Sequence, residues 1–351
     1  MRSFLKPTAG FVCLAALTCA GCSSEPDSGS SSSSSSQPSA AGAASRSPSA
    51  SASASAESAA TTYAPYVSAT TASDNDSAGS PATYNLAFVI AGGSSCTPKW
   101  NGTTAIGDSG VKSRISALTE SGGAVRVSFG GASGKELAST CDSASELAEA
   151  YGAALDAAGA TEADFDIEGK QLTDSDSVAL RSEAIALLQK ERSDLAVTFT
   201  LPVMPSGLDN DSLALLESAN DKGVQVSTVN IMTMNYGSSY DEDMGDYAET
   251  SAEAAHDQLQ DVFGLSDDGA WKGLALTSMI GVNDVDNETF SLSDAAQVRS
   301  FAEEKGVAWV SMWSTFRDQQ CEGDDADSDD AATNCSGVDQ GAGDFAEAFT
   351  G

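Results

Sequence analysis

The sequence predicts an α/β protein, a single (β/α)8 or TIM barrel behind a disordered N-terminal arm. Eight apolar, β-rich runs alternate with helical patterns from residue 63 onward, as in consecutive βα units. The segment 63–351 is long enough for one large catalytic domain. A doubly wound sheet is the alternative, but no Gly-x-Gly-x-x-Gly motif follows an early strand.

The first 22 residues predict an export signal. Arg2 and Lys6 give a positive start, and 10–20 is an apolar run too short to span a bilayer. The run ends in Cys-Ala-Gly-Cys, which resembles the cleavage motif of bacterial lipoproteins, with Cys19 in place of the usual Leu. This resemblance implies lipid attachment at Cys22 and a membrane-anchored protein outside the cytoplasm. Plain secretion after cleavage nearby is the alternative.

Residues 23–62 predict a disordered linker. They are rich in Ser and Ala and contain almost no large apolar side chain, so they cannot bury enough surface to fold. A flexible coil of about 40 residues spans roughly 35 Å. The linker would therefore hold a folded domain away from a membrane.

The strands and helices of the barrel are predicted from the spacing of apolar residues, which changes along the chain. Apolar runs predict strands, and amphipathic stretches between them predict helices. No helix is evident after the first strand, because 68–83 is rich in Ser, Asp and Gly. The predicted strands are 63–67, 84–91, 125–129, 163–168, 195–201, 226–234, 273–280 and 307–313, and the predicted helices are 109–121, 142–158, 175–192, 209–222, 249–263, 292–305 and 341–349.

Charge and histidine content exclude several functions. The net charge is −34, with 51 acidic and 17 basic residues, so nucleic acid is not an expected partner. The single histidine, His256, lies in an Ala-rich helical stretch and is expected to be incidental. One histidine makes a His-ligated zinc site or a Ser-His-Asp hydrolase improbable.

Four cysteines beyond the signal predict two disulfide bonds, as expected for an exported protein. Of the three possible pairings we favour Cys96–Cys141 and Cys321–Cys335. The second bond would close an acidic loop whose Asp cluster, 324–330, could bind calcium. That cluster lacks the Gly and terminal Glu of an EF-hand loop, so a solvated loop is preferred.

The predicted strand 163–168 carries acids at every second position. Asp164, Asp166 and Glu168 share one face, and Ala, Phe and Ile fill the other face, which would pack against the helices. Neighbouring acids about 7 Å apart repel one another, which raises at least one pKa and favours a shared proton. Such a group indicates acid–base chemistry or a metal site.

In a barrel, active-site residues lie at the C-terminal ends of strands. Glu168 ends its strand, where Gly169 lets the chain turn away, so Glu168 is the expected general acid. Asp166, one step deeper, would orient Glu168 and share its proton. Asp164, the deepest, would be structural and bond to its neighbour.

Four motifs in barrel order resemble family-18 glycoside hydrolases, the chitinases. The acids match the end of the family's Asp-x-x-Asp-x-Asp-x-Glu signature, although Thr161 and Glu162 replace its first Asp and the usual Gly. The other three are Ser128-Phe129-Gly130-Gly131 for the Ser-x-Gly-Gly motif, Met232-Thr233-Met234-Asn235-Tyr236-Gly237 for the Met-x-Tyr segment, and Ser311-Met312-Trp313-Ser314 for the segment with the Trp beneath the central sugar.

The resemblance implies retaining, substrate-assisted hydrolysis of β-1,4-linked N-acetylglucosamine, as in chitin, without a cofactor or metal. Glu168 would protonate the glycosidic oxygen, and the substrate's acetamido carbonyl would attack C1. Asp166 would hold the acetamido N–H, and the Tyr236 hydroxyl would bond the acetamido oxygen. The expected substrate contacts are Trp313, Ser128, Gly130, Gly131, Met234 and Asn235, and a monomer is expected.

Several Trp and Met side chains could belong either to the sugar site or to the core of the barrel. Trp309 and Trp313 share a strand face, so Trp313 is expected at the mouth and Trp309 deeper. Trp100 and Trp271 lie in predicted loops and could extend the sugar groove. Met232 and Met234 would by themselves be barrel core. Gly237 stands where many family members have Asp, which leaves the acetamido contacts at this corner open.

Two other functions remain. An endo-β-N-acetylglucosaminidase acting on N-glycans shares the same acid motif. A sugar-binding barrel without catalysis is the alternative from another class, but loss of the acid Glu usually marks such proteins and Glu168 is present. A metal site at the three acids is disfavoured, because no His or Cys converges on them.

Overall fold

The computed structural model describes residues 60–120, 122–322 and 334–351. The predicted signal with Cys22, nearly all of the predicted linker and the acidic cluster at 324–330 lie outside these residues, so the hypotheses about them stay predictions. Within the described residues, no helix has the length and apolar character needed to cross a membrane.

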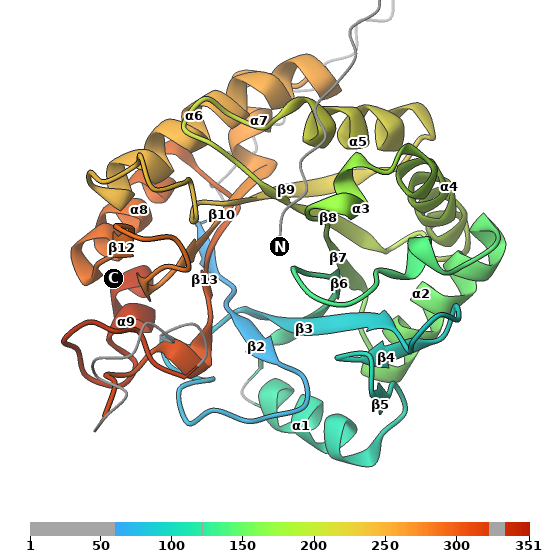
Figure 1. Cartoon of the computed structure of the whole chain (residues 1–351), viewed down its shortest axis with the longest axis horizontal. Coiled ribbons are helices and arrows are strands. Elements are labelled where there is room, and N and C mark those ends of the chain that lie inside the picture. Colours follow the sequence, from blue (N-terminus) through green and yellow to red (C-terminus); the bar gives the residue numbers. More distant parts are fainter. Residues whose placement is uncertain (1–59, 121, 323–333) are drawn as a thin grey trace, which may run out of the picture. The chain divides into compact units, whose positions relative to one another are not determined.

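Eight strand positions close into a parallel barrel in the described part of the chain (Figure 1). The first position is split in two, which closes the ring: β1 pairs with β13 and β2 pairs with β3. This confirms the predicted (β/α)8 barrel. The strands are β1 (Thr62–Tyr63), β2 (Tyr66–Ser68), β3 (Thr83–Ala91), β6 (Ala124–Gly130), β7 (Glu162–Asp166), β8 (Ala196–Pro202), β9 (Val226–Met232), β10 (Leu274–Met279) and β13 (Trp309–Trp313).

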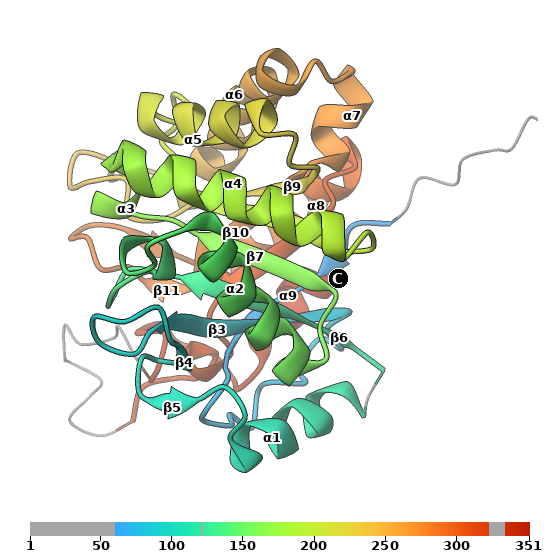
Figure 2. The ribbon, with the colours of Figure 1, turned by 90° about the vertical axis from the view of Figure 1, so that its right-hand side faces the viewer.

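Helices surround the strands close to their predicted positions (Figures 1 and 2). Most begin after an Asp or Ser whose side chain accepts an N–H of the first turn, as Asp108 and Ser143 do. As predicted, no helix follows β2. The helices are α1 (Ser109–Thr119), α2 (Ala144–Ala158), α4 (Ser175–Glu191), α5 (Asn210–Asp221), α6 (Met244–Phe263), α8 (Leu292–Lys305) and α9 (Asp344–Thr350).

Short elements in the connecting loops were not evident from the sequence, because they are too brief to show a period. They are β4 (Pro98–Trp100), β5 (Thr104–Ala105), α3 (Lys170–Thr173), α7 (Asp267–Lys272), β11 (Gly281–Val282) and β12 (Thr289–Phe290), with single 3-10 turns at Leu137–Ser139 and Thr315–Arg317. The hairpin of β11 and β12 lies at the end of the barrel where the site is found.

The barrel includes the last two residues of the predicted linker, Thr61 and Thr62. Thr61 is buried, and its hydroxyl donates to the carbonyl oxygens of Ala302 and Val307 at 3.0 and 2.8 Å. Thr62 pairs with Trp309 in the sheet. A threonine-rich start carries no apolar signal, and for that reason the boundary was placed too late.

Both favoured disulfide bonds are present. Cys96–Cys141 joins the loop after β3 to the loop after β6, and Cys321–Cys335 closes the acidic loop. The loops after β3 and β6 both leave the C-terminal ends of their strands. The first bond therefore fixes two loops at the end of the barrel where active sites form.

The expected groove tryptophans point into the protein instead. Trp100 lies in β4 with no exposed surface, and its indole N–H donates to the carbonyl oxygen of Ile106 at 3.4 Å. Trp271 lies in α7 and stacks on His256 with ring centroids 4.1 Å apart. The prediction that these rings extend a sugar groove is wrong, because short elements in both loops turn the side chains inward.

An ion pair closes the N-terminal end of the barrel. Arg126 and Glu162 are register partners on β6 and β7, and their side chains meet at 2.6 Å. The Arg126 guanidinium also lies over the Trp309 ring, 4.8 Å from its centroid. Trp309 therefore lies deep, as predicted. The acid at position 162, which departs from the family signature, has a structural partner.

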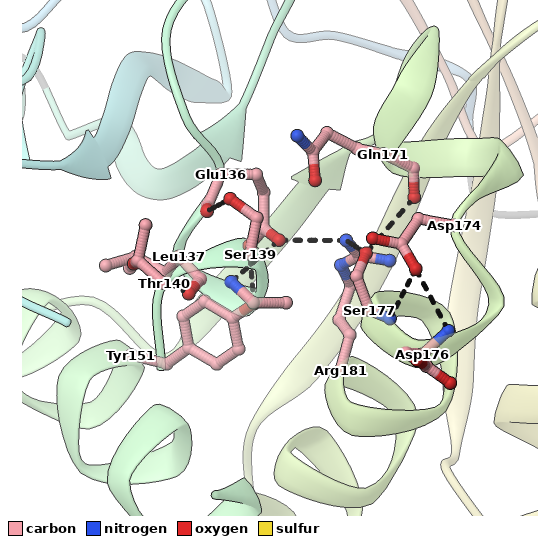
Figure 3. Close-up of polar contacts among 11 residues, drawn as sticks. Glu136, Leu137, Ser139, Thr140, Tyr151, Gln171, Asp174, Asp176, Ser177 and Arg181 are labelled. Atoms are coloured by element: carbon pink, nitrogen blue, oxygen red, sulfur yellow. Dashed lines mark hydrogen bonds and ion pairs between the residues drawn. The ribbon is translucent and has the colours of Figure 1, made fainter. Parts of the chain in front are cut away.

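A second ion pair lies behind β7, between α2 and α4, and is almost completely buried (Figure 3). Glu136, from the loop after β6, accepts from Arg181 at 2.8 Å and from the Tyr151 hydroxyl at 2.6 Å. The Tyr151 ring packs against Phe129 and Phe165, with centroids 4.8 and 5.0 Å away. Phe165 stands between Asp164 and Asp166 in the chain, so this network supports the acid strand from outside.

Replacing Arg181 with Met should destabilise the fold by about 3 kcal/mol or more, because the buried Glu136 charge loses its partner. The double variant Glu136→Gln/Arg181→Met should recover part of this loss. Urea unfolding measures both. The control is Lys222→Met, whose exposed pair with Glu183 should contribute less than ~1 kcal/mol. An Arg181→Met cost no larger than that of Lys222→Met would contradict this account.

Candidate active site

A cavity of about 510 Å³ opens at the C-terminal ends of the strands. This volume suits a small organic ligand or part of an oligosaccharide. Its walls are aromatic and methionine side chains, with acids on several sides. Among the lining residues are Tyr66, Phe88, Asp166, Glu168, Met234 and Trp313.

Asp164 lies beneath the cavity and is completely buried. It accepts three hydroxyl donors from three other strands: Tyr66 at 2.9 Å, Ser128 at 2.5 Å and Thr200 at 2.7 Å. The structural role predicted for Asp164 agrees with this, but its partners are these hydroxyls and not the expected neighbouring acid. Burial raises the pKa of Asp164, and the three hydrogen bonds oppose that rise.

The hydroxyl layer continues around the barrel. Thr277 donates to Asn230 at 2.9 Å, and the Asn230 amide donates to Thr200 at 2.9 Å. All three are buried and come from β10, β9 and β8, so the polar layer extends from Asp164 on β7 across three further strands. The sequence carried a signal for this layer, namely single polar residues at alternate positions of otherwise apolar strands.

Asp166 and Glu168 are the two acids of the segment 163–168 that line the cavity. Asp166 is 5% exposed, and its Oδ1 atom is buried without a hydrogen-bond partner. Burial raises the pKa of Asp166 well above its ordinary value, and the charges of Glu168 and Asp164 raise it further. Burial also raises the pKa of Glu168, while its hydrogen bond with Asp166 opposes that rise. Both pKa values are thus shifted in the direction that the close spacing of the acids predicts, which favours a proton held between them.

The chain turns sharply after this pair. The strand itself ends at Asp166, two residues before the predicted end, but Ile167 still donates to the carbonyl oxygen of Thr200 at 3.0 Å. Gly169 adopts φ +52°, outside the usual range of other residues, and begins α3. Glu168 is thereby left partly exposed at the cavity mouth, where a proton donor is needed.

The Ser-x-Gly-Gly segment supports the acids and does not touch the cavity. Gly130 has φ +100°, and a Cβ atom there would lie 2.1 Å from the Asp166 carbonyl oxygen. Gly131 donates its N–H to the same oxygen at 2.9 Å. The predicted substrate contacts by Ser128, Gly130 and Gly131 are therefore wrong, since none of the three lines the cavity. Close backbone approach requires glycine here.

Trp313 forms one wall of the cavity, at the mouth as predicted. Its ring is partly exposed and stacks on Phe88 with centroids 5.6 Å apart and a 22° interplanar angle. Tyr66 meets the Trp313 ring edge-on at 5.8 Å. Phe88 and Tyr66 were missed as site residues, because aromatic residues in strands are ordinarily core.

Tyr236 does not reach the cavity, so its predicted contact with the acetamido oxygen is wrong. The side chain is buried, its ring packs with Tyr240 and Tyr247, and its hydroxyl accepts from Ser251 on α6 at 3.3 Å. The chain leaves β9 after Met232 and turns at Asn235, where φ is +55°. That turn directs Tyr236 toward the helices.

Met234 and Asn235 do line the cavity, as predicted. Asn235 is exposed, and its side-chain oxygen accepts the N–H of Asp284 at 3.1 Å. Asp284 belongs to the loop between β11 and β12 and also lines the cavity, as does Asp209 at the start of α5. Neither acid was evident from the sequence, because each stands in an acidic, loop-like context. Within the described residues, no group of three or more His, Cys, Asp or Glu could hold a metal ion.

A barrel whose mouth holds two hydrogen-bonded acids with raised pKa values beside an aromatic wall has the arrangement of a glycoside hydrolase. No model of a protein family matches the chain. The catalytic domain of the hyperthermophilic chitinase from Pyrococcus furiosus is 30% identical, with a TM-score of 0.72 over 82% of this chain and 93% of that domain. The chain therefore belongs to family 18 of the glycoside hydrolases.

Two curated relatives agree. The probable bifunctional chitinase/lysozyme of Escherichia coli K12 is 34% identical over 275 residues, 73% of this chain and 31% of that protein. Endochitinase 11 of Metarhizium anisopliae is 34% identical over 219 residues, 59% of this chain and 42% of that protein. The chain thus matches less than half the length of each curated relative.

Replacing Asp166 with Asn should stabilise the protein at pH 8, with a gain that shrinks toward pH 4. An acid whose pKa is raised by folding contributes stability that is fully present at low pH and is lost as pH rises through the raised pKa. Asn cannot ionise and escapes that loss. Thermal midpoints across this range measure the effect, with the exposed Asp286→Asn as control. An equal gain at both pH values would contradict the assignment.

Proposed function

We propose that this protein hydrolyses β-1,4-linked N-acetylglucosamine polymers, chitin or its oligosaccharides, by a retaining, substrate-assisted mechanism. The observation that carries the proposal is the pair of Asp166 and Glu168. The buried, unpartnered Oδ1 of Asp166 can accept an amide N–H. Beside it, Glu168 is exposed enough to meet the glycosidic oxygen.

The pair would act in two steps. Glu168 donates its proton to the glycosidic oxygen while the acetamido carbonyl oxygen attacks C1, so the C1–O bond breaks and an oxazolinium ion forms. Asp166 accepts the acetamido N–H and offsets the developing positive charge. Glu168 then takes a proton from water, which attacks C1 and reopens the ring. Two inversions retain the configuration, and Trp313 stacks beneath the sugar.

Asn235 is the group best placed to bond the acetamido oxygen, since Tyr236 lies elsewhere. Its side chain is exposed at the cavity wall. The Asn235 amide nitrogen lies 3.5 Å from Asp284 Oδ2, at the limit of a hydrogen bond, and can turn to a better acceptor. An amide donor there would polarise the attacking group less than a phenol.

Comparison with a substrate complex supports the choice of substrate. Catalytic-site mutants of active domain 2 of the Pyrococcus furiosus chitinase were crystallised with chito-oligosaccharides, and that domain is 29% identical to this chain with a TM-score of 0.72. The cavity of this protein has the aromatic wall and the paired acids that such a ligand needs.

The cellular setting is proposed from the sequence. Export through the signal, lipid attachment at Cys22 and the Ser/Ala-rich linker would place a monomeric barrel outside the cytoplasm, on the membrane or released. Two disulfide bonds support an oxidising environment.

Replacing Glu168 with Gln should lower kcat on an N-acetylglucosamine tetramer by at least ~10²-fold, because the proton donor is lost while binding is kept. Product release measured by mass spectrometry checks this, together with a thermal midpoint to show an intact fold. Glu217→Gln, at an exposed site on α5, is the matched control. Undiminished turnover by Glu168→Gln would overturn the proposed function, whereas tight binding without turnover by the wild type would favour the sugar-binding barrel.

Substrate comparison tests the role of the acetamido group. Glucosamine or glucose oligomers of equal length should be cleaved at least ~10³-fold more slowly than N-acetylglucosamine oligomers, because they lack the internal nucleophile. Proton NMR should show the β-anomer as the first product. An initial α-anomer would contradict retention. Faster cleavage of a high-mannose glycopeptide than of chitin oligomers would favour the endo-β-N-acetylglucosaminidase.

A further inference from the structure

Glu288 is a buried acid that belongs to none of the four sequence motifs. It follows the tip of the hairpin formed by β11 and β12 and is 1% exposed. Its Oε1 accepts the N–H of Gly237 at 2.7 Å. Burial raises the pKa of Glu288, and hydrogen bonds from the N–H groups of Gly237, Tyr236 and Asn235 oppose that rise. Its Oε2 is buried and has no partner at hydrogen-bond distance. Burying a carboxylate oxygen without a hydrogen-bond partner lowers the stability of the fold.

The backbone that Glu288 binds is an unusual turn. Asn235 and Gly237 both have positive φ, +55° and +119°. Successive N–H groups in such a turn converge on one point and form an anion-binding concavity. The turn lies beyond the end of β9, where no strand ladder holds it. Glu288 therefore replaces the acceptor that a neighbouring strand would supply.

The hairpin that carries Glu288 is itself firmly held. Arg317 is fully buried and donates to the carbonyl oxygens of Ile280 and Val282 at 3.0 and 2.7 Å. The N–H of Val282 donates to Ser336, next to the Cys321–Cys335 disulfide, at 2.7 Å. Glu288 is thus held in place by the hairpin, and its hydrogen bond can fix the position of the turn at 235–237.

We propose that Glu288 is a positioning residue for the substrate's acetamido group and acts through Asn235. Its carboxylate holds the turn that brings Asn235 to the cavity lined also by Asp166, and Asp284 of the same hairpin fixes the Asn235 side chain. The inference rests on the proposed function, and it assigns a role at the site to an acid that never touches substrate.

A double-mutant cycle tests the proposal. The variants are Glu288→Gln, Asn235→Ala and their combination, assayed for kcat and KM on the N-acetylglucosamine tetramer. Each single change should lower kcat/KM by about tenfold, mainly through kcat, because the attacking group is displaced. If Glu288 acts through Asn235, the double variant should lose no more than the larger single loss. Asp286→Asn, an exposed acid on the same hairpin, should stay within about twofold of the wild type.

The outcomes separate the two proposals. Losses that multiply in the double variant, or Glu288→Gln activity within twofold of the wild type, would overturn the positioning role alone. If the wild type does not cleave the tetramer, the proposed function fails. Calorimetry then measures binding of the tetramer to Glu168→Gln and to the double variant Glu168→Gln/Glu288→Gln. Weaker binding by the double variant supports the positioning role of Glu288, and equal binding overturns it. Should Glu288→Gln not fold, Glu288→Asp replaces it in the cycle.

Discussion

The structure depends on placing three acids at alternate positions along β7 and the two residues after it, and on burying two of them completely or nearly so. Water cannot stabilise their charges there, so the protein supplies other means, and these differ with depth. Asp164 receives three hydroxyl donors, whereas Asp166 receives none at Oδ1 and is hydrogen-bonded to Glu168. Neighbouring strands carry small or hydroxylated side chains at the matching positions, and glycines allow the backbone of β6 to approach Asp166. The amino acids of the adjoining strands are thus constrained by this one set of charges.

Local patterns in the sequence were sufficient to predict the strands, most helices, the order of the acids by depth and the cysteine pairs. Strand and helix periods are properties of neighbouring residues, and the acids lie on one strand, so their relative placement follows from the pleat. Errors arose where the direction of a side chain depends on a turn. Tyr236 follows a residue with positive φ and points to α6, although Met234 two residues earlier lines the cavity. The Ser-x-Gly-Gly segment was assigned to substrate, but its glycines serve close approach of the backbone.

Long-range partnerships could not be predicted, because no local pattern marks them. Arg126 with Glu162 closes the N-terminal end of the barrel, and Arg181 with Glu136 lies behind the acid strand. Glu288 binds a turn 51 residues away. In a chain with 51 acidic residues, a buried acid looks like any surface acid. Only the fold shows which acids are buried. Asp164 lies beneath the cavity and Glu136 behind the acid strand, whereas Asp318 is buried at the start of α9, where it accepts two N–H groups.

Four of the buried acids fall into two groups that differ in whether their oxygen atoms have partners. Glu136 is paired with a cation and Asp164 with three donors, so their charges are compensated within the protein. Asp166 and Glu288 each keep one oxygen atom without a partner. An uncompensated buried oxygen costs stability, and such costs concentrate where function requires them. For Asp166 the missing partner is a donor that a ligand can bring into the cavity. For Glu288 the oxygen that is used holds the turn that carries Asn235, which lines the same cavity as Asp166.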